Sequence, residues 1–384
     1  MQRLARGLQV ETRFKIGEIV IALRAEDAQG GFPVEESYQK FITQEPAQVI
    51  LRHYMQTPPS LVEWERVFNS QGVWQLYRQA TNTGSRYAVG LHSPVFGLKP
   101  YQAGIFSSDF LSGELFTEPQ HFVQRGQPFP LRYPMAEVIM INLLSQGRGI
   151  LLHACAVQDG EHGYLFTGVS GAGKSTTAWL WENQPGAILL SDDRVILRQH
   201  PDGFYIYGTP WHGDVHAAAQ DCVRLERIFV LRHASQNQAV PLRPVDLAAR
   251  LFVRSFPPFW NPSGLAFNLQ LLGDLRIGQE VERQPPDLDL PGREREAGRR
   301  QQAGRPAENP FREQIGDGQE DDEGQDADDP QAEGVQSEEE TGSRQDIRVE
   351  NGLEIDVARG KERVAVVQDP LGGQVMEALI HPQG

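Results

Sequence analysis

The sequence predicts an α/β fold class, α+β overall, with a β-rich first part, an α/β domain and an acidic tail. Three observations support this prediction. Short runs rich in β-branched and aromatic residues, divided by Gly, Pro and Asn, fill residues 1–133. Apolar runs then alternate with a helical pattern over residues 134–278, as in an α/β core. Beyond them the chain becomes polar and acidic.

The N-terminal domain, residues 1–133, is expected to be an antiparallel β-rich meander with one solvated face. Turn-forming residues such as Gly30-Gly31 and Pro58-Pro59 separate its apolar runs. The aromatic residues in these runs, Trp74 and Tyr77 among them, are interpreted as core. The strands are expected at residues 18–27, 48–56, 72–80, 86–93 and 102–118.

The α/β domain is predicted over residues 134–278. It opens with a helix, because apolar residues recur at helical spacing after Pro134 and Gly147 is placed to end it. Later helices are expected at residues 174–181, 246–256 and, after a cap at Asn261, 265–275. Buried strands are expected at residues 150–157, 163–168, 187–198 and 224–234, and residues 204–213 are expected to form a strand that enters a glycine-rich turn.

Two further segments follow. Residues 279–346 are rich in Pro, Gly, Asp and Glu and are expected to form a disordered acidic linker. Residues 347–384 form a small C-terminal segment with patterns for two or three strands and a short helix, either docked on the core or separate. The expected strand that would complete the α/β domain after Leu275 is missing at that point.

Charge and cysteine content exclude several classes of protein. The net charge is −15, but 27 of the 51 acidic and 13 of the 36 basic residues lie in residues 275–384. The preceding part is nearly neutral, so nucleic acid is not an expected partner. Cys155 and Cys222 cannot build a disulfide framework, which favours the cytoplasm. The longest apolar stretch is broken by polar residues and the N-terminus lacks an apolar signal region, so no membrane partner is expected.

Residues 168–175 read Gly-Val-Ser-Gly-Ala-Gly-Lys-Ser and satisfy the pattern G-x-x-x-x-G-K-[ST] between an expected strand and an expected helix. This geometry points backbone N–H groups and the positive helix end at a polyphosphate. We therefore expect ATP and Mg²⁺ as cofactors, with Lys174 reaching the β/γ-phosphates and Ser175 ligating the metal. The expected ATP-binding residues are Gly168, Ser170, Gly171, Ala172, Gly173, Lys174, Ser175 and Thr176.

Two acids and a histidine complete the candidate site. Asp192 and Asp193 follow an apolar run, and an acid in that position holds the metal beside a P-loop. Adjacent side chains on a strand face opposite ways, so at most one of them serves the nucleotide unless the strand has already ended. The alternative is a turn with solvated acids. His153 lies on the strand before the loop and is either close to the phosphates or an ordinary core histidine.

With HAxxV, GxSGAGKST and LxSDDRV in this order, residues 148–275 resemble the C-terminal catalytic domain of the HPr kinase/phosphorylase family. Its P-loop core is related to the ATP-dependent phosphoenolpyruvate carboxykinases. The resemblance implies that fold type, a phosphate-handling role for His153, and one aspartate for Mg²⁺ with the other shuttling a proton. Related kinases often assemble as rings, so the resemblance is compatible with a homo-oligomer, and the sequence leaves the oligomeric state open. The family's Arg-Gly-Leu-Gly core is absent near Phe204–Gly213, which argues against HPr as the acceptor.

The sequence thus predicts an ATP-dependent serine kinase that transfers the γ-phosphoryl group of Mg-ATP to a serine-type hydroxyl of a protein, peptide or small molecule. The expected catalytic residues are Asp193 as base, His153 and Lys174, with Ser175 and Asp192 at the metal, although the two aspartates can exchange roles. The alternatives are a nucleotide-dependent switch without an acceptor and a carboxykinase-like enzyme. Thr209, Trp211 and His212 are candidates for the acceptor side, the alternative being an aromatic anchor in a surface turn. Arg254 is a candidate phosphate contact, the alternative being an arginine that covers a helix face.

Overall fold

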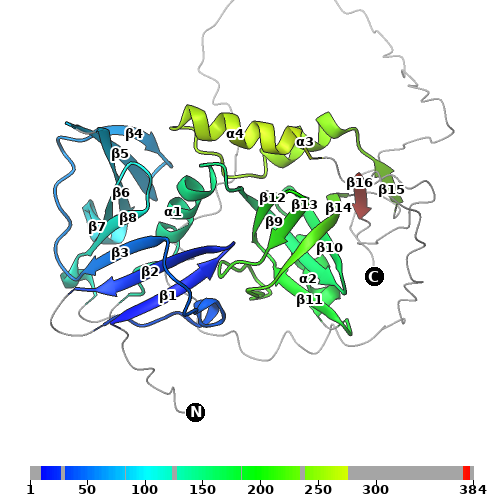
Figure 1. Cartoon of the computed structure of the whole chain (residues 1–384), viewed down its shortest axis with the longest axis horizontal. Coiled ribbons are helices and arrows are strands. Elements are labelled where there is room, and N and C mark those ends of the chain that lie inside the picture. Colours follow the sequence, from blue (N-terminus) through cyan, green and yellow to red (C-terminus); the bar gives the residue numbers. More distant parts are fainter. Residues whose placement is uncertain are drawn as a thin grey trace, which may run out of the picture. The chain divides into compact units, whose positions relative to one another are not determined.

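A computed structural model describes residues 10–26, 31–82, 84–122, 128–182, 184–233, 238–275 and 375–380. These residues form two mixed eight-stranded sheets with a few helices, so the coarse α/β prediction is confirmed (Figure 1). They all fall in one unit defined by contacts between Cα atoms. The predicted linker at 279–346 and most of the segment 347–384 lie outside the described residues.

The first sheet has the strand order β1-β2-β3-β8-β7-β6-β5-β4. Five expected runs correspond to strands in it, the last run dividing into β7 and β8, whereas β1 and β4 are not predicted from the sequence. Its strands are β1 (Glu11–Ile16), β2 (Ile19–Ala25), β3 (Val49–Tyr54), β4 (Glu65–Asn69), β5 (Trp74–Thr81), β6 (Gly84–Ser93), β7 (Gly97–Phe106) and β8 (Ser112–Thr117), with 3₁₀ turns η1 (Glu36–Phe41), η2 (Pro94–Phe96) and η3 (Pro119–His121).

The prediction of an antiparallel meander is wrong for the middle of this sheet. Strand β3 lies parallel to both of its neighbours, β2 and β8. The connection from β2 to β3 contains η1 and is long enough to return the chain to the same end of the sheet, as a parallel pair requires. Alternating apolar residues identify a strand but not its neighbour, so the sequence pattern could not reveal this arrangement.

The second sheet has the order β10-β9-β12-β13-β14-β16-β15, and β11 also pairs with β9. The glycine loop, defined as residues 168–173, joins β10 to helix α2, and α1 precedes β9. The elements are α1 (Met135–Leu144), β9 (Ile150–Asp159), β10 (His162–Gly168), α2 (Lys174–Glu182), β11 (Ala187–Ser191), β12 (Arg194–His200), β13 (Gly203–Tyr207), β14 (Cys222–His233), β15 (Gln238–Pro241), α3 (Pro244–Phe252), α4 (Pro262–Gly273) and β16 (Val375–Ile380).

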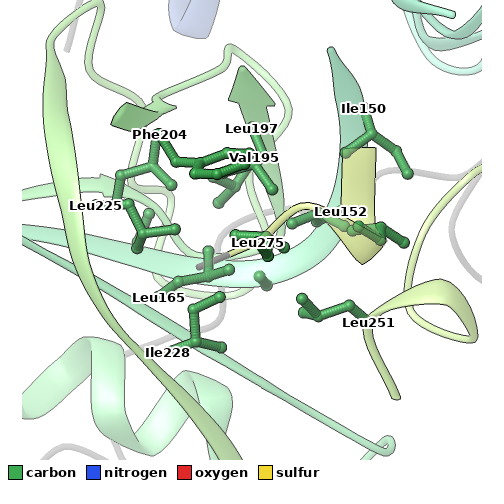
Figure 2. Close-up of a cluster of buried hydrophobic side chains, with 14 of the residues drawn as sticks. Ile150, Leu152, Leu165, Val195, Leu197, Phe204, Leu225, Ile228, Leu251 and Leu275 are labelled. Carbon is green, nitrogen blue, oxygen red and sulfur yellow. The ribbon is translucent and has the colours of Figure 1, made fainter. Parts of the chain in front are cut away.

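Buried side chains cover both faces of this sheet. Successive residues of a strand point to opposite faces, so each strand contributes to both cores. Leu152 and Ala154 of β9 join the core on the side of α3 and α4, which Figure 2 shows with Leu165, Val195 and Leu251. Cys155 and Val157 join the core on the side of α2, with Phe166, Ala178 and Trp181. His153 has the same parity as Cys155 and therefore belongs to the α2 side of the sheet.

Two local differences from the sequence prediction concern the site. The single strand expected at residues 187–198 is two strands, and Asp192 and Asp193 occupy the bend between β11 and β12. Helix α3 ends at Phe252 instead of residue 256. By contrast, the predicted cap is confirmed, since Asn261 Oδ1 accepts the Gly264 N–H at 3.1 Å.

The C-terminal strand β16 inserts between β14 and β15, parallel to the former and antiparallel to the latter. It supplies a strand of the kind expected beyond Leu275, from about a hundred residues later in the chain. Within the part of the chain that the structure describes, no helix is both long and apolar enough to span a bilayer.

Candidate functional site

The glycine loop has a backbone that only glycine accommodates easily. Gly171 has φ +74° and Gly173 has φ +99°, both in the left-handed region that side chains disfavour. Gly168 has ordinary φ but no space, because a Cβ atom there would lie 2.8 Å from the Ala172 Cβ and from the Leu231 carbonyl oxygen. The spacing of the three glycines therefore follows from one tight turn between β10 and α2.

Lys174 begins α2 and bends back over this turn. Its ammonium group donates hydrogen bonds to the carbonyl oxygens of Gly168 at 3.2 Å and Val169 at 3.3 Å. Only 7% of the residue is exposed. Burial lowers the pKa of Lys174, and the cations Arg254 and Arg194 lower it further, although Asp193 opposes them. The ammonium group thus lies in a crowded, partly desolvated position at the start of the helix.

The other loop residues lie on the solvent side. Ser170, Gly171 and Thr176 are exposed, Gly173 and Ser175 are half-buried, and Ala172 is buried against the α2 face of the sheet. The first N–H groups of a helix have no partner within that helix. The start of α2 therefore offers donors beside the Lys174 ammonium group, which is the arrangement that binds phosphate at helix N-termini.

His153 and Asp193, predicted separately, lie in contact. His153 Nε2 is 3.2 Å from Asp193 Oδ1. The pairing of β9 with β12 brings them together, because His153 is opposite Arg194 in the register and the Asp193 carbonyl accepts the Ala154 N–H at 3.1 Å. The strands β9 and β10 are also neighbours, as the prediction for His153 required.

Asp193 is held from its other side by Arg194. Arg194 Nη1 lies 2.7 Å from Asp193 Oδ2, and Arg194 Nε lies 3.2 Å from Glu137 Oε1, an ion pair that lacks hydrogen-bond geometry. Burial raises the pKa of Asp193, but the hydrogen bond from His153 and the charges of Arg194 and Lys174 outweigh it. The net shift is downward, so this carboxyl group is ionised at neutral pH.

Glu137 and Arg194 are the two members of this cluster that the sequence analysis did not identify. Glu137 lies on α1, whose ten residues are all buried. Burial raises the pKa of Glu137 to about 7, with Arg194 acting against the shift and Asp193 adding to it. The single acid in a helix that is apolar apart from Asn142 was the available signal, since a carboxyl group is rarely buried without a partner.

Asp192 points away from this cluster, into the loop that follows β13. Its Oδ1 accepts the Gly213 N–H at 2.9 Å and its Oδ2 accepts the Val215 N–H at 2.8 Å. The residue is 3% exposed. A Cβ atom on Gly213 would lie 2.8 Å from Asp192 Oδ2, so glycine is needed there. The visible role of Asp192 is to fix this loop, and its predicted role at the metal stays a prediction.

The segment 208–213 is anchored to the N-terminal part of the chain. Trp211 is buried and its Nε1 donates to Tyr38 Oη at 2.8 Å. Thr209 is also buried, and its hydroxyl donates to the Arg194 carbonyl at 2.6 Å. His212 is half-buried, with its ring 4.4 Å from that of His216 between centroids. Of the three candidates for the acceptor side, only His212 is therefore open to solvent.

A scan against protein-family models and a search of curated proteins both find no match for this chain.

The described residues contain no group of three or more His, Cys, Asp or Glu side chains that could hold a metal ion. Magnesium bound with ATP does not require such a group, because phosphate oxygens and water supply most of its ligands and the protein adds one or two. The half-buried Ser175 suits that limited contribution, since it follows Lys174 in the first turn of α2 and offers one hydroxyl oxygen.

Proposed function

We propose that this protein is an ATP-dependent kinase that transfers the γ-phosphoryl group of Mg-ATP to a serine-type hydroxyl of a protein, peptide or small molecule. One observation carries the proposal. Lys174, which follows the glycine loop, is close enough to the ionised carboxylate of Asp193 for each to shift the pKa of the other, and His153 and Arg194 orient that carboxylate. A phosphate cradle beside a fixed carboxylate contains the parts that phosphoryl transfer to a hydroxyl needs.

The cradle would position the triphosphate. The N–H groups at the start of α2 and the Lys174 ammonium would bind the β- and γ-phosphates, and Ser175 would face the metal. When bound, Mg²⁺ would neutralise charge on the phosphates. Burial of Lys174 strengthens its attraction for phosphate, because less water screens a charge in a desolvated position. Phosphate oxygens would then replace the carbonyl oxygens of Gly168 and Val169 as its partners.

Asp193 would act as the base toward the acceptor hydroxyl. It carries a negative charge at neutral pH, and its neighbours His153 and Arg194 hold both carboxylate oxygens in place. A base held in one orientation costs less entropy to align with the acceptor. His153 would stabilise the carboxylate through its Nε2 contact. Asp192 would contribute to the metal side only by sharing oxygens that already accept two backbone N–H groups.

The principal alternative is a nucleotide-dependent switch that hydrolyses ATP without an acceptor. A switch that only binds nucleotide would gain nothing from a fixed carboxylate, whereas one that hydrolyses ATP would use it to orient the attacking water. The resemblance to HPr kinase motifs favours transfer to an acceptor. The absence of the family's Arg-Gly-Leu-Gly core keeps HPr itself outside the proposal.

The test follows the γ-phosphate. Purified full-length protein is incubated with γ-labelled ATP, Mg²⁺ and a library of hydroxyl-bearing peptides and proteins, with the Lys174→Ala variant in parallel. The proposal predicts label on an acceptor for the wild-type chain and none for the variant. Label that leaves ATP only as inorganic phosphate would favour the switch, and a chain that binds no nucleotide would refute both.

A further inference from the structure

Arg254 lies on the segment that follows α3 and runs beside β9. The His153 N–H donates to the Arg254 carbonyl at 2.7 Å, and the Phe256 N–H donates to the Leu151 carbonyl at 3.0 Å. Leu152 and Ser255 form an antiparallel bridge between these two bonds. Residues 254–256 therefore extend the sheet locally along one edge of β9, which fixes the backbone of Arg254.

The same edge of β9 pairs with β10, and this pairing stops where Thr167 lies opposite Ala154. The N–H and C=O groups of one strand residue point to the same edge, and the His153 carbonyl accepts the Thr167 hydroxyl at 3.0 Å. Thr167 is the residue before Gly168, where the glycine loop begins. Arg254 and the start of the glycine loop are thus successive neighbours along the same edge of β9.

The charge of Arg254 is not balanced by an acid in the described part of the chain. Its guanidinium group contacts the adjacent Val253 carbonyl at 3.4 Å, and no ion pair is formed there. It is nevertheless close enough to Lys174 to lower the pKa of that ammonium group. Arg194 differs, because Asp193 and Glu137 pair with its two sides. Asp193 also acts on Lys174, but its carboxylate oxygens are already paired with His153 and Arg194, so the charge of Arg254 beside Lys174 favours an anionic ligand.

We propose that Arg254 binds the terminal phosphate of the bound nucleotide opposite Lys174, and that it gives the site a preference for a nucleoside triphosphate over a diphosphate. This inference rests on the proposed function. The Arg254 guanidinium offers a planar fork of donors that can hold two phosphate oxygens at once, whereas Lys174 supplies a point charge. The two residues would hold the γ-phosphate between them, and its oxygens would screen the mutual repulsion of the cations.

The experiment compares two probes, the Mg²⁺ complex of the non-hydrolysable ATP analogue AMP-PNP and Mg-ADP, by calorimetry with full-length protein. Arg254→Gln is expected to weaken AMP-PNP binding about tenfold or more, as loss of a charged hydrogen bond does, and ADP binding less than about twofold. Arg254→Lys keeps the charge but lacks the planar fork of donors, so its affinity for AMP-PNP should lie between those of wild type and Arg254→Gln. Arg250→Gln is the matched control, an arginine of α3 that faces Asp246, and should leave both affinities unchanged.

The outcomes separate this inference from the proposed function. If wild-type protein binds AMP-PNP and Arg254→Gln leaves that affinity unchanged, or weakens both probes equally, the role of Arg254 is refuted while the kinase proposal stands. If the wild-type chain binds neither probe, the proposed function fails first. Thermal unfolding of each variant identifies a folding defect. If Arg254→Gln does not fold, Arg254→Lys is used instead, and its ratio of AMP-PNP affinity to ADP affinity is compared with that of wild type. An unchanged ratio overturns the inference.

Discussion

His153 Nε2 lies 3.2 Å from Asp193 Oδ1, while Arg194 Nη1 lies 2.7 Å from Asp193 Oδ2. The carboxylate is held at both oxygens by groups from two adjacent strands, because β9 carries His153 and β12 begins with Arg194. Rotation of the Asp193 side chain would break both contacts. The orientation of this carboxylate is therefore a property of the strand pairing and not of the bend that contains it.

Asp193→Asn is expected to abolish turnover while preserving nucleotide binding. Asparagine keeps the shape and can still contact His153 and Arg194, but it cannot accept the acceptor's proton. Loss of a general base typically reduces the rate by about 10²–10⁴-fold, so kcat should fall by that amount. The measurement is label transfer from γ-labelled ATP together with calorimetric affinity for AMP-PNP. A fully active variant would move the role of base to Asp192 or His153.

Lys174→Ala is expected to weaken nucleotide binding by about a hundredfold or more while the fold is retained, because a desolvated cation binds phosphate strongly. Burial already lowers the pKa of Lys174, which shows that its charge is costly in the free protein. Removal of the ammonium group relieves this cost but also removes its hydrogen bonds to the Gly168 and Val169 carbonyls, so the thermal unfolding temperature should change little. Nucleotide affinity and thermal unfolding are measured on the same samples. Wild-type affinity for AMP-PNP in this variant would contradict the cradle.

Glu137 predicts a pH dependence of stability. Its folded pKa of about 7 exceeds the unfolded value of 4.5, so the folded state retains a proton between these values that the unfolded state has lost. The free energy of unfolding therefore decreases as pH rises from about 4.5 to 7 and then levels off. Glu137→Gln removes this contribution, and between pH 5 and 8 the variant should lose about 1–3 kcal/mol less stability than wild type.

Urea unfolding at both pH values measures the Glu137 effect. Glu18→Gln is the matched control. Glu18 Oε2 pairs with Arg198 Nη1 at 3.0 Å, and Arg198 lies on β12 as Arg194 does, but the Glu18 side chain is much more exposed than that of Glu137. Its stability should follow the wild-type pH profile. Equal pH slopes in wild type and Glu137→Gln would show that Glu137 has an ordinary pKa in the folded state.

Asp192→Asn should destabilise the fold by about 1–3 kcal/mol, because one of its two backbone partners would face an amide N–H and remain unsatisfied. The partners are Gly213 and Val215. Asp246→Asn serves as control, since Asp246 forms an exposed pair with Arg243 and should leave stability close to that of wild type. Urea unfolding distinguishes them. Unchanged stability in Asp192→Asn would show that these bonds do not hold the loop.

The Trp211–Tyr38 contact couples the candidate site to the N-terminal part of the chain. Trp211 Nε1 donates to Tyr38 Oη, which in turn donates to the Leu131 carbonyl at 2.7 Å. Tyr38→Phe leaves two buried groups without a partner and should cost about 1–3 kcal/mol. Trp211→Phe removes one partner together with part of the packing. Unfolding of both single variants and the double variant gives their coupling, and strictly additive effects would contradict this hydrogen bond.

Sequence reasoning located most strands and helices of the α/β domain, because their apolar spacing and caps are local signals. It failed where pairing partners decide the structure. The parallel neighbours of β3 depend on which strands meet across the sheet, and the early end of α3 depends on the hydrogen bonds that residues 254–256 make with β9. Both are interactions between residues far apart in the chain, and hydrophobic periodicity carries no information about them.

For the candidate site, the sequence alone determined the glycine loop, since left-handed backbone at Gly171 and Gly173 restricts the residue type directly. It also placed acids shortly after an apolar run. Only the tertiary structure decided that Asp193 contacts His153 and that Asp192 turns into the loop at Gly213. It also decided that Glu137 of α1 pairs with Arg194 and that the backbone of Arg254 lies beside β9. The physical reason is that backbone conformation is a local constraint, whereas the orientation of a charge depends on the strands and helices that pack around it.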